Sequence, residues 1–353
     1  MSIKKLANIG GISSIIRYMN MLTSNNQFFS TSITDIAMSS SASPYINAWA
    51  WDSGLGVKYS NPSTLPGIFL YGLKWNPAKN AIVGADYSNG FVGYPWSSGF
   101  GTKYANITMP GGVIQSFGMS GDGATVFVGT SADPWINAYP FSNISGFGAK
   151  YSNPSTSLGG SYQGVTSIDI KDSDTIFMTT PFIVPYIHAY AFSSGFGTKY
   201  ANPSTSASYN SPDISYSSPA SAVAVVALAS PTVYAWSSGF GTKYADSPTQ
   251  FSGYNISFSP SGQSIVGDGS QILQSYVWSA GFGTKHANAP QSSGLNYKTN
   301  SISFSNDGKV VGIGFDYSLP YYSLHSYSAQ DGFGFKYSVP AFTTVAVNSI
   351  AFR

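Results

Sequence analysis

The sequence predicts an all-β fold, a seven-bladed β-propeller of four-stranded blades in a closed ring, preceded by a short N-terminal helical arm. Three observations support this prediction. The composition suits strands and turns, one sequence unit recurs seven times, and a sequence typical of the first strand of the unit stands alone at the C-terminus. We take them in that order.

The composition favours strands over helices and implies no large basic or acidic field. Only 8% of the 353 residues are charged, against about 25% in an average protein. Tyr (25), Phe (23) and Gly (38) are abundant, and these residues suit strands and tight turns. The net charge is +2 and Arg17 and Arg353 are the only arginines, so we expect no nucleic-acid partner. The absence of cysteine excludes a disulfide framework.

The recurring unit is Gly-Phe-Gly-Thr-Lys-Tyr and its variants, and each copy contains one lysine. Successive lysines are 42 to 51 residues apart, which is the length of a four-stranded propeller blade. The seven lysines are Lys58, Lys103, Lys150, Lys199, Lys243, Lys285 and Lys336. Their number predicts seven blades.

Each unit divides into four short strand candidates. The first alternates apolar and polar residues, as in Asn300–Ser305, and ends at an Asp-Gly pair that indicates a hairpin. The second is continuously apolar, as in Val310–Ile313 and Ala222–Leu228, which predicts burial on both faces. The third carries alternating aromatic residues, as in Tyr234–Trp236. We expect the fourth to follow the Ser-Gly-Phe-Gly turn and to carry Lys-Tyr-Ala-Asn-Pro.

The two ends of the chain predict how the ring closes. The first unit has candidates for a second strand (Asp35–Ser39), a third (Tyr45–Trp51) and a fourth (Lys58–Asn61), but none for a first strand. The missing strand matches the C-terminal Ser349–Arg353. We therefore expect the C-terminal strand to pair with Asp35–Ser39 and complete blade one, which also removes an open edge.

Over nearly all of residues 34–353 the sequence resembles the repeat pattern of WD-repeat propellers. The resemblance lies in the order Trp-Ser-Ser-Gly followed by a first strand that ends in Ser-Pro-Ser-Gly (Ser259–Gly262). The sequence departs from that family because no unit has its Gly-His dipeptide and only Trp51-Asp52 has the Trp-Asp dipeptide. The recurring Trp-Ser-Ser-Gly-Phe-Gly-Thr-Lys-Tyr also resembles repeat proteins of tailed-bacteriophage virions. That resemblance implies a place in a virus particle.

The recurring lysines have two interpretations. Seven cations at one position per blade could form a ring that holds a polyanion or sulfated glycan. Alternatively, each lysine lies on the outer edge strand of its blade and prevents edge-to-edge pairing with another chain. We favour the second interpretation, and keep the seven lysines as candidate surface ligand positions.

The recurring aromatic residues are interpreted as core. Pairs spaced by two, such as Tyr190/Phe192 and Tyr234/Trp236, point to one side of the sheet, where stacked blades need bulky apolar faces. The residue of the Gly-Phe-Gly turn either fills the gap between blades or is exposed for stacking on a sugar, and we favour the first. These residues are Leu55, Phe100, Phe147, Phe196, Phe240, Phe282 and Phe333.

The sequence contains no recognisable catalytic or metal-binding constellation. His188, His286 and His325 lie at different places in their units, without the spacing of metal ligands. There is no Gly-x-Ser-x-Gly nucleophile motif and no phosphate-binding loop. We therefore expect no enzyme activity, no cofactor and no metal.

Residues 1–33 do not fit the repeat and are interpreted as a docking arm, with residues 34–353 as the propeller. The apolar residues of the arm recur at helical spacing: Ile12, Ile15, Ile16, Met19 and Leu22. So short an amphipathic helix must pack on something else, either another protein or the propeller itself. The apolar run is interrupted by Arg17 and Asn20 and lacks a cleavage site, so we expect a retained segment and no membrane insertion.

Two main functions remain, with a hydrolase or lyase as a third and weaker alternative. The first is a non-enzymatic structural protein of a virion, a fibre, decoration or adsorption component that is attached to other virion proteins through the arm and assembled in the host cytoplasm. The second is a multivalent carbohydrate-binding propeller, a lectin with one pocket per blade, which would be extracellular. An adsorption protein that binds a host surface glycan would combine both. Apart from the arm, we expect function in three segments that differ between units: residues 181–185, Asn143-Ile144 and the longer loop around Gln291–Thr299.

Overall fold

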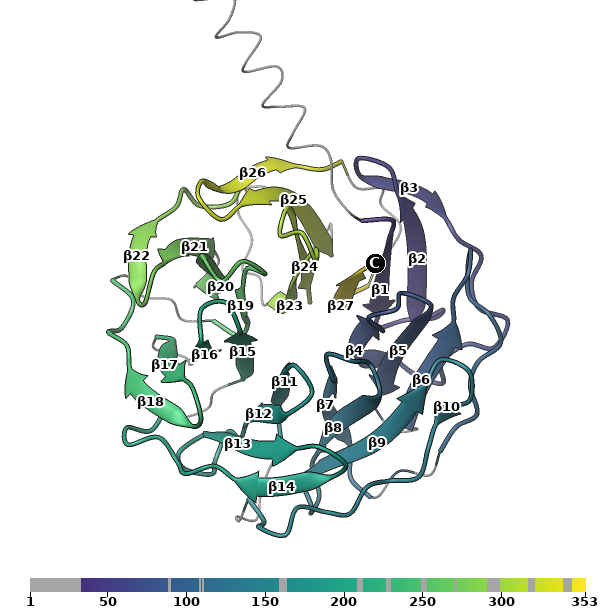
Figure 1. Ribbon diagram of the computed structural model, residues 1–353. Coiled ribbons are helices and arrows are strands. Elements are labelled where there is room, and N and C mark those ends of the chain that lie inside the picture. The colour runs from purple at the N-terminus through teal and green to yellow at the C-terminus, as the bar shows by residue number, and fades with distance from the viewer. Residues whose placement is uncertain are drawn as a thin grey trace, which may run out of the picture.

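The computed structural model describes residues 33–87, 90–107, 109, 111–158, 164–207, 212–226, 230–248, 253–269, 272–290, 299–316, 321–338 and 345–353. These residues form seven β-sheets arranged in a ring (Figure 1). Within them no helix is long and apolar enough to cross a membrane. The arm residues predicted to dock, Ile12, Ile15, Ile16, Met19 and Leu22, lie outside the described residues.

The strands of the first three blades follow the order of the chain, except at the ring closure. Blade one contains β27 (Val347–Phe352), β1 (Asp35–Ser40), β2 (Ile46–Trp51) and β3 (Leu55–Lys58). Blade two contains β4 (Leu70–Trp75), β5 (Ala81–Asp86) and β6 (Gly90–Pro95). Blade three contains β7 (Ile114–Met119), β8 (Thr125–Thr130), β9 (Ile136–Ser142) and β10 (Gly146–Phe147).

The other four blades each form a four-stranded sheet in chain order. Blade four contains β11 (Ser167–Lys171), β12 (Thr175–Thr179), β13 (Ile187–Phe192) and β14 (Phe196–Lys199). Blade five contains β15 (Asp213–Ser217), β16 (Ala222–Val226), β17 (Thr232–Trp236) and β18 (Phe240–Lys243). Blade six contains β19 (Ile256–Phe258), β20 (Ser264–Gly269), β21 (Ile272–Trp278) and β22 (Phe282–Lys285). Blade seven contains β23 (Thr299–Phe304), β24 (Val310–Phe315), β25 (Tyr322–Ser328) and β26 (Gly332–Lys336).

The predicted ring closure is confirmed. The C-terminal β27 pairs antiparallel with β1, with Phe352 opposite Ile36 and Ser349 opposite Ser39. The backbone N–H of Arg353 donates to the carbonyl of Asp35 at 2.9 Å, and its guanidinium forms an ion pair with the Asp35 carboxylate. Both ends of the propeller sequence therefore lie in one sheet.

The outermost strand begins earlier than the sequence analysis predicted. In blade four, Phe192 of β13 pairs with Phe196 of β14, so the Phe of the Gly-Phe-Gly segment is already the first strand residue. The turn is shorter because Gly195 takes a φ of +146°, a conformation that favours glycine. Strand β14 ends at Lys199, and most of Lys-Tyr-Ala-Asn-Pro therefore follows the strand.

Blade two has an abbreviated outermost strand. An isolated bridge between Trp96 and Phe100 takes the place of the hairpin that closes the other blades. The backbone N–H of Tyr104 donates to the carbonyl of Gly93 at 2.9 Å. The equivalent bond joins Tyr200 to Ala189 and Tyr244 to Val233 in blades four and five. Blade two thus keeps the pairing of the fourth strand with fewer regular residues.

The hydrophobic core lies between neighbouring blades. The second strands are buried along their whole length, as β8, β16 and β24 show, which confirms burial on both faces. Aromatic rings of adjacent blades meet edge to face. Phe177 of blade four lies 4.5 Å from Trp236 of blade five, measured between ring centroids. Each hydrophobic layer is formed by side chains of two neighbouring blades. The blades therefore depend on one another to bury their apolar faces.

Candidate functional site

A cavity of about 420 Å³ lies at the centre of the ring, where the innermost strands begin. Every blade contributes to its lining. The residues that line it are Phe69, Tyr71, Gln115, Ser116, Phe117, Thr166, Ser167, Ile168, Pro212, Asp213, Tyr254, Asn255, Thr299, Asn300, Asp316 and Asn348. A concave site with convergent polar groups and aromatic faces is the usual form of a ligand-binding pocket. This cavity is the candidate functional site.

One equivalent position in each unit supplies a lining residue. It lies two residues before the first inward apolar residue of the innermost strand. In blades two to seven and then blade one it is occupied by Tyr71, Gln115, Thr166, Pro212, Tyr254, Asn300 and Asn348. The backbone position recurs but the side chain differs in nearly every unit, so the seven units together line a cavity without rotational symmetry.

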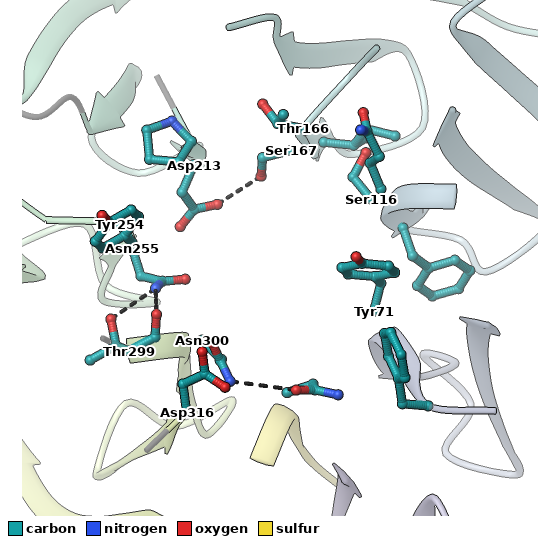
Figure 2. A pocket seen from close by; sticks show the side chains of 16 residues that line it. Tyr71, Ser116, Thr166, Ser167, Asp213, Tyr254, Asn255, Thr299, Asn300 and Asp316 are labelled. Carbon is teal, nitrogen blue, oxygen red and sulfur yellow. Dashed lines mark hydrogen bonds between the residues drawn. The ribbon is translucent and has the colours of Figure 1, made fainter. Parts of the chain in front are cut away.

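Blade two forms an aromatic wall. The rings of Phe69 and Tyr71 lie 5.5 Å apart, and both lie within 5.7 Å of the ring of Tyr87. Tyr71 is nevertheless 40% exposed. Figure 2 shows its side chain on the opposite side of the cavity from Asp213 and Asn255. An exposed ring supported from behind by other rings can stack on an apolar face of a ligand.

Blades four and five place a carboxylate at the polar wall. Asp213, at the start of β15, accepts hydrogen bonds from the hydroxyl of Ser167 (2.7 Å) and from the backbone N–H of Ile256 (2.9 Å). Desolvation raises the pKa of Asp213 to about 7, although these hydrogen bonds lower it, and the nearby Asp169 raises it further. Asp213 is therefore the group in the cavity whose charge changes near neutral pH.

Blades six and seven supply a fixed amide. The side-chain amide of Asn255 donates to both the carbonyl and the hydroxyl oxygen of Thr299, each at 2.8 Å. Behind them, Asp268 accepts the backbone N–H groups of Tyr254 and Asn255 at 2.7 Å. Burial raises the pKa of Asp268. This network holds Asn255 in one orientation toward the cavity.

Part of the polar lining serves to join the blades. The hydroxyl of Ser116 in blade three donates to the carbonyl of Val165 before blade four, at 2.8 Å. Asn300 in blade seven donates to the carbonyl of Val347 in blade one, at 3.3 Å. Because these groups link neighbouring innermost strands, they would be present even in a propeller that bound nothing.

Asp213 and Asn255 link neighbouring blades in the same way, whereas Asp316 and the side-chain oxygen of Gln115 do not within the described part of the chain. Asp316 makes no hydrogen bond or ion pair with the part of the chain that the structure describes. The side-chain oxygen of Gln115 is buried and has no hydrogen-bond partner among those same residues. Among the described lining residues there are two carboxylates, Asp213 and Asp316, and no lysine or arginine. A ligand with hydroxyl or ammonium donors suits this lining, whereas a phosphate group does not.

The recurring lysines lie away from this cavity. Five of them are residues of the outermost strands at the rim, and Lys103 and Lys150 occupy the equivalent position in blades two and three. Lys243 forms an ion pair with Asp246 at 2.9 Å. The ammonium of Lys150 donates to the side-chain oxygen of Asn137 at 2.9 Å. None of the seven lines the central cavity, so the structure does not bring them together into one cationic site.

The recurring aromatic residues pack between blades. Phe240 lies against Trp236 at 5.0 Å between ring centroids, and Phe282 lies 5.3 Å from Trp278. All seven residues at this position pack against a core cluster while remaining partly exposed: Leu55, Phe100, Phe147, Phe196, Phe240, Phe282 and Phe333. This arrangement agrees with the packing interpretation.

The three histidines lie in different blades. Burial lowers the pKa of His188 to about 3 and that of His325 to about 4, so both are neutral at physiological pH. His286 bonds to the hydroxyl of Ser275 at 2.8 Å. Among the described residues no group of three His, Cys, Asp or Glu side chains could hold a metal ion.

The segments that differ between units have separate locations. Phe182 and Val184 are exposed in the connection between β12 and β13, and Ile144 is exposed in the turn between β9 and β10. None of them lines the cavity. Residues 291–298 of the longer loop lie outside the described residues, but Thr299 lines the cavity.

Sequence reasoning missed the lining residues because it looked for patterns that recur. A signal was nevertheless present. When the seven units are aligned on the first inward apolar residue, the position two residues before it varies in polarity and size, from Pro212 to Tyr71. Variation at a position with a constant structural environment indicates that the position is not needed to build the blade.

Comparison with known proteins supports the fold. No family model matches the chain, and no curated protein matches it in sequence. Among solved structures, the chain is similar to a putative 6-phosphogluconolactonase from Bacteroides fragilis, with a TM-score of 0.67 over 91% of this chain and 98% of that chain. The two sequences are 8% identical, so the similarity concerns the seven-bladed propeller architecture alone.

Proposed function

We propose that the protein is a non-catalytic recognition protein that binds a saccharide in its central cavity. The observation that carries this proposal is the composition of the two walls. The exposed ring of Tyr71 faces a wall of carboxylate and amide groups that includes Asp213 and Asn255. Sugars present an apolar face of C–H groups and a rim of hydroxyls, so one wall would stack and the other would accept and donate hydrogen bonds.

The proposed site is one central pocket instead of one pocket per blade. The aromatic residues that recur in each blade, such as Phe240 and Trp236, pack against one another in the inter-blade core. They are therefore poorly placed for stacking on a ligand. The cavity, by contrast, combines one residue position from all seven units.

The lining also argues against a phosphorylated substrate. The similar solved structure is that of a putative 6-phosphogluconolactonase. A phosphosugar needs cationic groups or a nest of backbone N–H groups around its phosphate. The described lining residues of this chain contain Asp213 and Asp316 and no lysine or arginine. We therefore propose an unphosphorylated ligand.

The sequence resemblance to WD-repeat propellers, and the looser one to repeat proteins of tailed-bacteriophage virions, stay predictions. The latter favours a place for this recognition protein on a virus particle, where the saccharide would be a host surface glycan. Low charge and near-regular repetition agree with a particle component. Copurification with intact virions supports this setting, and its absence from purified virions contradicts it without affecting the saccharide site.

A glycan array with the full chain, followed by calorimetry on the best ligand, tests the proposal. Tyr71→Ala should weaken binding by about tenfold, which corresponds to roughly 1.4 kcal/mol of lost stacking and apolar contact. Phe182→Ala is the matched control, because Phe182 is 42% exposed and lies outside the cavity. It should leave the affinity unchanged. No binding on the array, or equal loss in both variants, overturns the proposed site.

A further inference from the structure

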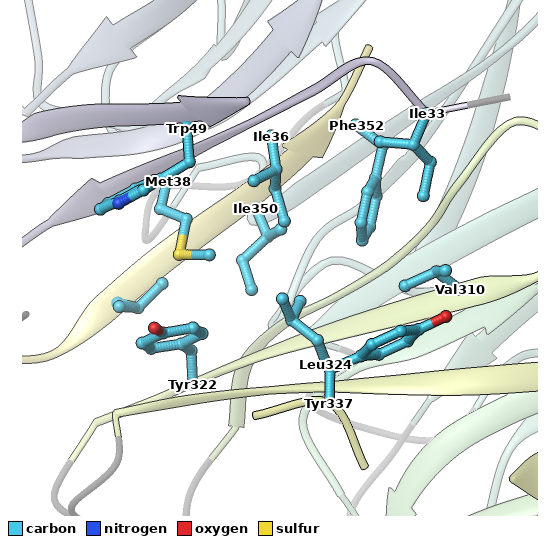
Figure 3. Close-up of a cluster of buried hydrophobic side chains, with 11 residues drawn as sticks. Ile33, Ile36, Met38, Trp49, Val310, Tyr322, Leu324, Tyr337, Ile350 and Phe352 are labelled. Carbon is cyan, nitrogen blue, oxygen red and sulfur yellow. The ribbon is translucent and has the colours of Figure 1, made fainter. Parts of the chain in front are cut away.

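The junction between blades six and seven lacks the aromatic pair that joins the other blades. At each of the other junctions, the tyrosine after the recurring lysine meets a Trp or Phe of the next blade edge to face, with ring centroids 4.9 to 5.7 Å apart. Figure 3 shows one of these tyrosines, Tyr337, among the apolar side chains that blades seven and one bury at the ring closure. The pairs are Tyr59/Trp96, Tyr104/Phe141, Tyr151/Phe192, Tyr200/Trp236, Tyr244/Trp278 and Tyr337/Trp51.

Three residues at this junction depart from the repeat, and they contact one another. His286 stands where the other blades have the tyrosine, and Tyr327 stands where the next blade has Trp or Phe. Ser275 occupies a position that is Ala, Gly, Val or Leu in the other blades. The side chains of Ser275, His286 and Tyr327 are 0%, 9% and 2% exposed. A buried hydrogen-bonded cluster therefore replaces an apolar contact.

The hydrogen bonds of this cluster determine which nitrogen of His286 carries the proton. Nε2 lies 3.1 Å from the carbonyl oxygen of Gln330, and because a carbonyl only accepts, Nε2 is the donor. In the neutral ring Nδ1 is then an acceptor, and the hydroxyl of Ser275 donates to it at 2.8 Å. The oxygen of Ser275 in turn accepts the hydroxyl of Tyr327 at 2.5 Å. Every donor in this chain has an acceptor as long as His286 is neutral.

A proton on Nδ1 disrupts the chain of hydrogen bonds. The nitrogen becomes a donor, so the hydroxyl of Ser275 must turn away and its bond with Tyr327 must reverse or break. Burial also lowers the pKa of His286, although the Gln330 carbonyl and the nearby Asp331 raise it. Among the described residues, Tyr327 and Asp331 are the titratable groups that face His286. The charged ring is therefore more stable in water than in the closed junction.

We propose that the junction between blades six and seven is acid-sensitive and opens locally when His286 becomes protonated. An exposed histidine has a pKa of about 6.5, so the stability that the neutral ring contributes is fully present above that pH. It declines as the pH falls further, because the open form takes up the proton more readily than the closed form. The side chain of Asn255 donates to Thr299 across the same two blades, so this junction reaches from the rim to the central cavity.

Hydrogen exchange of the full chain, followed by mass spectrometry between pH 7.5 and 5.5, tests the proposal. Rates are corrected for intrinsic exchange at each pH. Peptides that cover β22 and His286 should lose protection by up to about tenfold at pH 5.5, the limit for one proton at one pH unit below an ordinary histidine pKa. Peptides that cover β18 and Tyr244 are the internal reference, because the pair of Tyr244 and Trp278 does not titrate in this range.

The matched variant gives this junction the residues of the junction between blades five and six. His286→Tyr/Ser275→Val/Tyr327→Trp reproduces the pattern of Tyr244, Val233 and Trp278. A tyrosine can also satisfy the carbonyl of the next turn, as Tyr104 does by donating to the carbonyl of Asn143 at 2.6 Å. Protection of β22 in this variant should be the same at pH 7.5 and 5.5.

Two single substitutions keep the test decisive if the triple variant does not fold. His286→Gln retains a donor and an acceptor without a charge and should also abolish the loss of protection. His188→Asn removes a buried histidine of blade four and introduces the residue that blades one and three have there, Asn47 and Asn137. It should leave the loss at β22 unchanged. Constant protection in the wild type, or an equal loss in His286→Gln, overturns the proposal. So does a loss that His188→Asn abolishes, which would assign the response to global unfolding.

Discussion

The rim and the centre of this propeller use the same repeated backbone in opposite ways. At the rim, the same side chains recur from blade to blade, such as Lys199 and Lys243 or Phe240 and Phe282. At the centre, the equivalent position carries Tyr71 in one blade and Asn300 in another. The residues that recur pack between blades or protect the edge strands, whereas the residues that vary line the cavity. The comparison indicates that in this repeat protein the recurring residues build the blades, whereas the varying residues line the cavity that we propose as the binding site.

The largest effect is expected when a recurring aromatic ring is removed. Trp236 is 4% exposed and contacts Phe177 of the preceding blade. Trp236→Ala should lower the free energy of unfolding by about 3–5 kcal/mol, because it leaves a cavity between blades. Tyr254→Ala removes a 40% exposed ring from the cavity and should cost less than about 1 kcal/mol. Urea unfolding followed by tryptophan fluorescence and circular dichroism measures both, and similar losses would contradict the division between rim and centre.

The second test uses the pH dependence of the cavity. Burial raises the pKa of Asp213 to about 7, against about 3.9 in an unfolded chain. The folded protein therefore retains a proton that the unfolded chain releases. This contribution to stability is complete below about pH 4 and is lost as the pH rises through 7. Asp213→Asn, which cannot ionise, should have a melting temperature that exceeds that of the wild type increasingly between pH 4.5 and 7.5.

Differential scanning fluorimetry at several pH values measures this difference. Asp316→Asn is the control, because Asp316 lines the same cavity without a hydrogen bond to the described residues. Its melting temperature should follow that of the wild type. A constant difference between Asp213→Asn and the wild type over the whole pH range would show that the charge of Asp213 does not affect stability.

The smallest effect is expected at a rim lysine. Lys243→Ala removes a partly exposed ion pair with Asp246 and should change the free energy of unfolding by less than about 0.5 kcal/mol. Saccharide affinity should also remain unchanged, because Lys243 lies outside the cavity. Binding of a sulfated polysaccharide that the substitution abolishes would instead support a cationic ring at the rim, and would place recognition among the recurring residues.

Most of the architecture could be predicted from the repeat. The hydrophobic pattern of each unit determines which strands are buried, as β16 and β24 confirm. The start of the fourth strand was misplaced because the residues that form the turn depend on the φ of a single glycine, Gly195. That conformation is decided by closure of the hairpin and leaves little trace in the hydrophobic pattern.

By itself, the sequence determined the number of blades, their order and the closure of the ring by Ser349–Arg353, because a repeat that cannot bury its own faces must stack on its neighbours. The tertiary structure alone decided where a ligand could bind. Tyr71 and Asn300 are more than two hundred residues apart in the sequence, and nothing in either unit predicts that they line the same cavity. The ring brings one position of every unit to a common axis, so the chemistry of the centre depends on all seven units together.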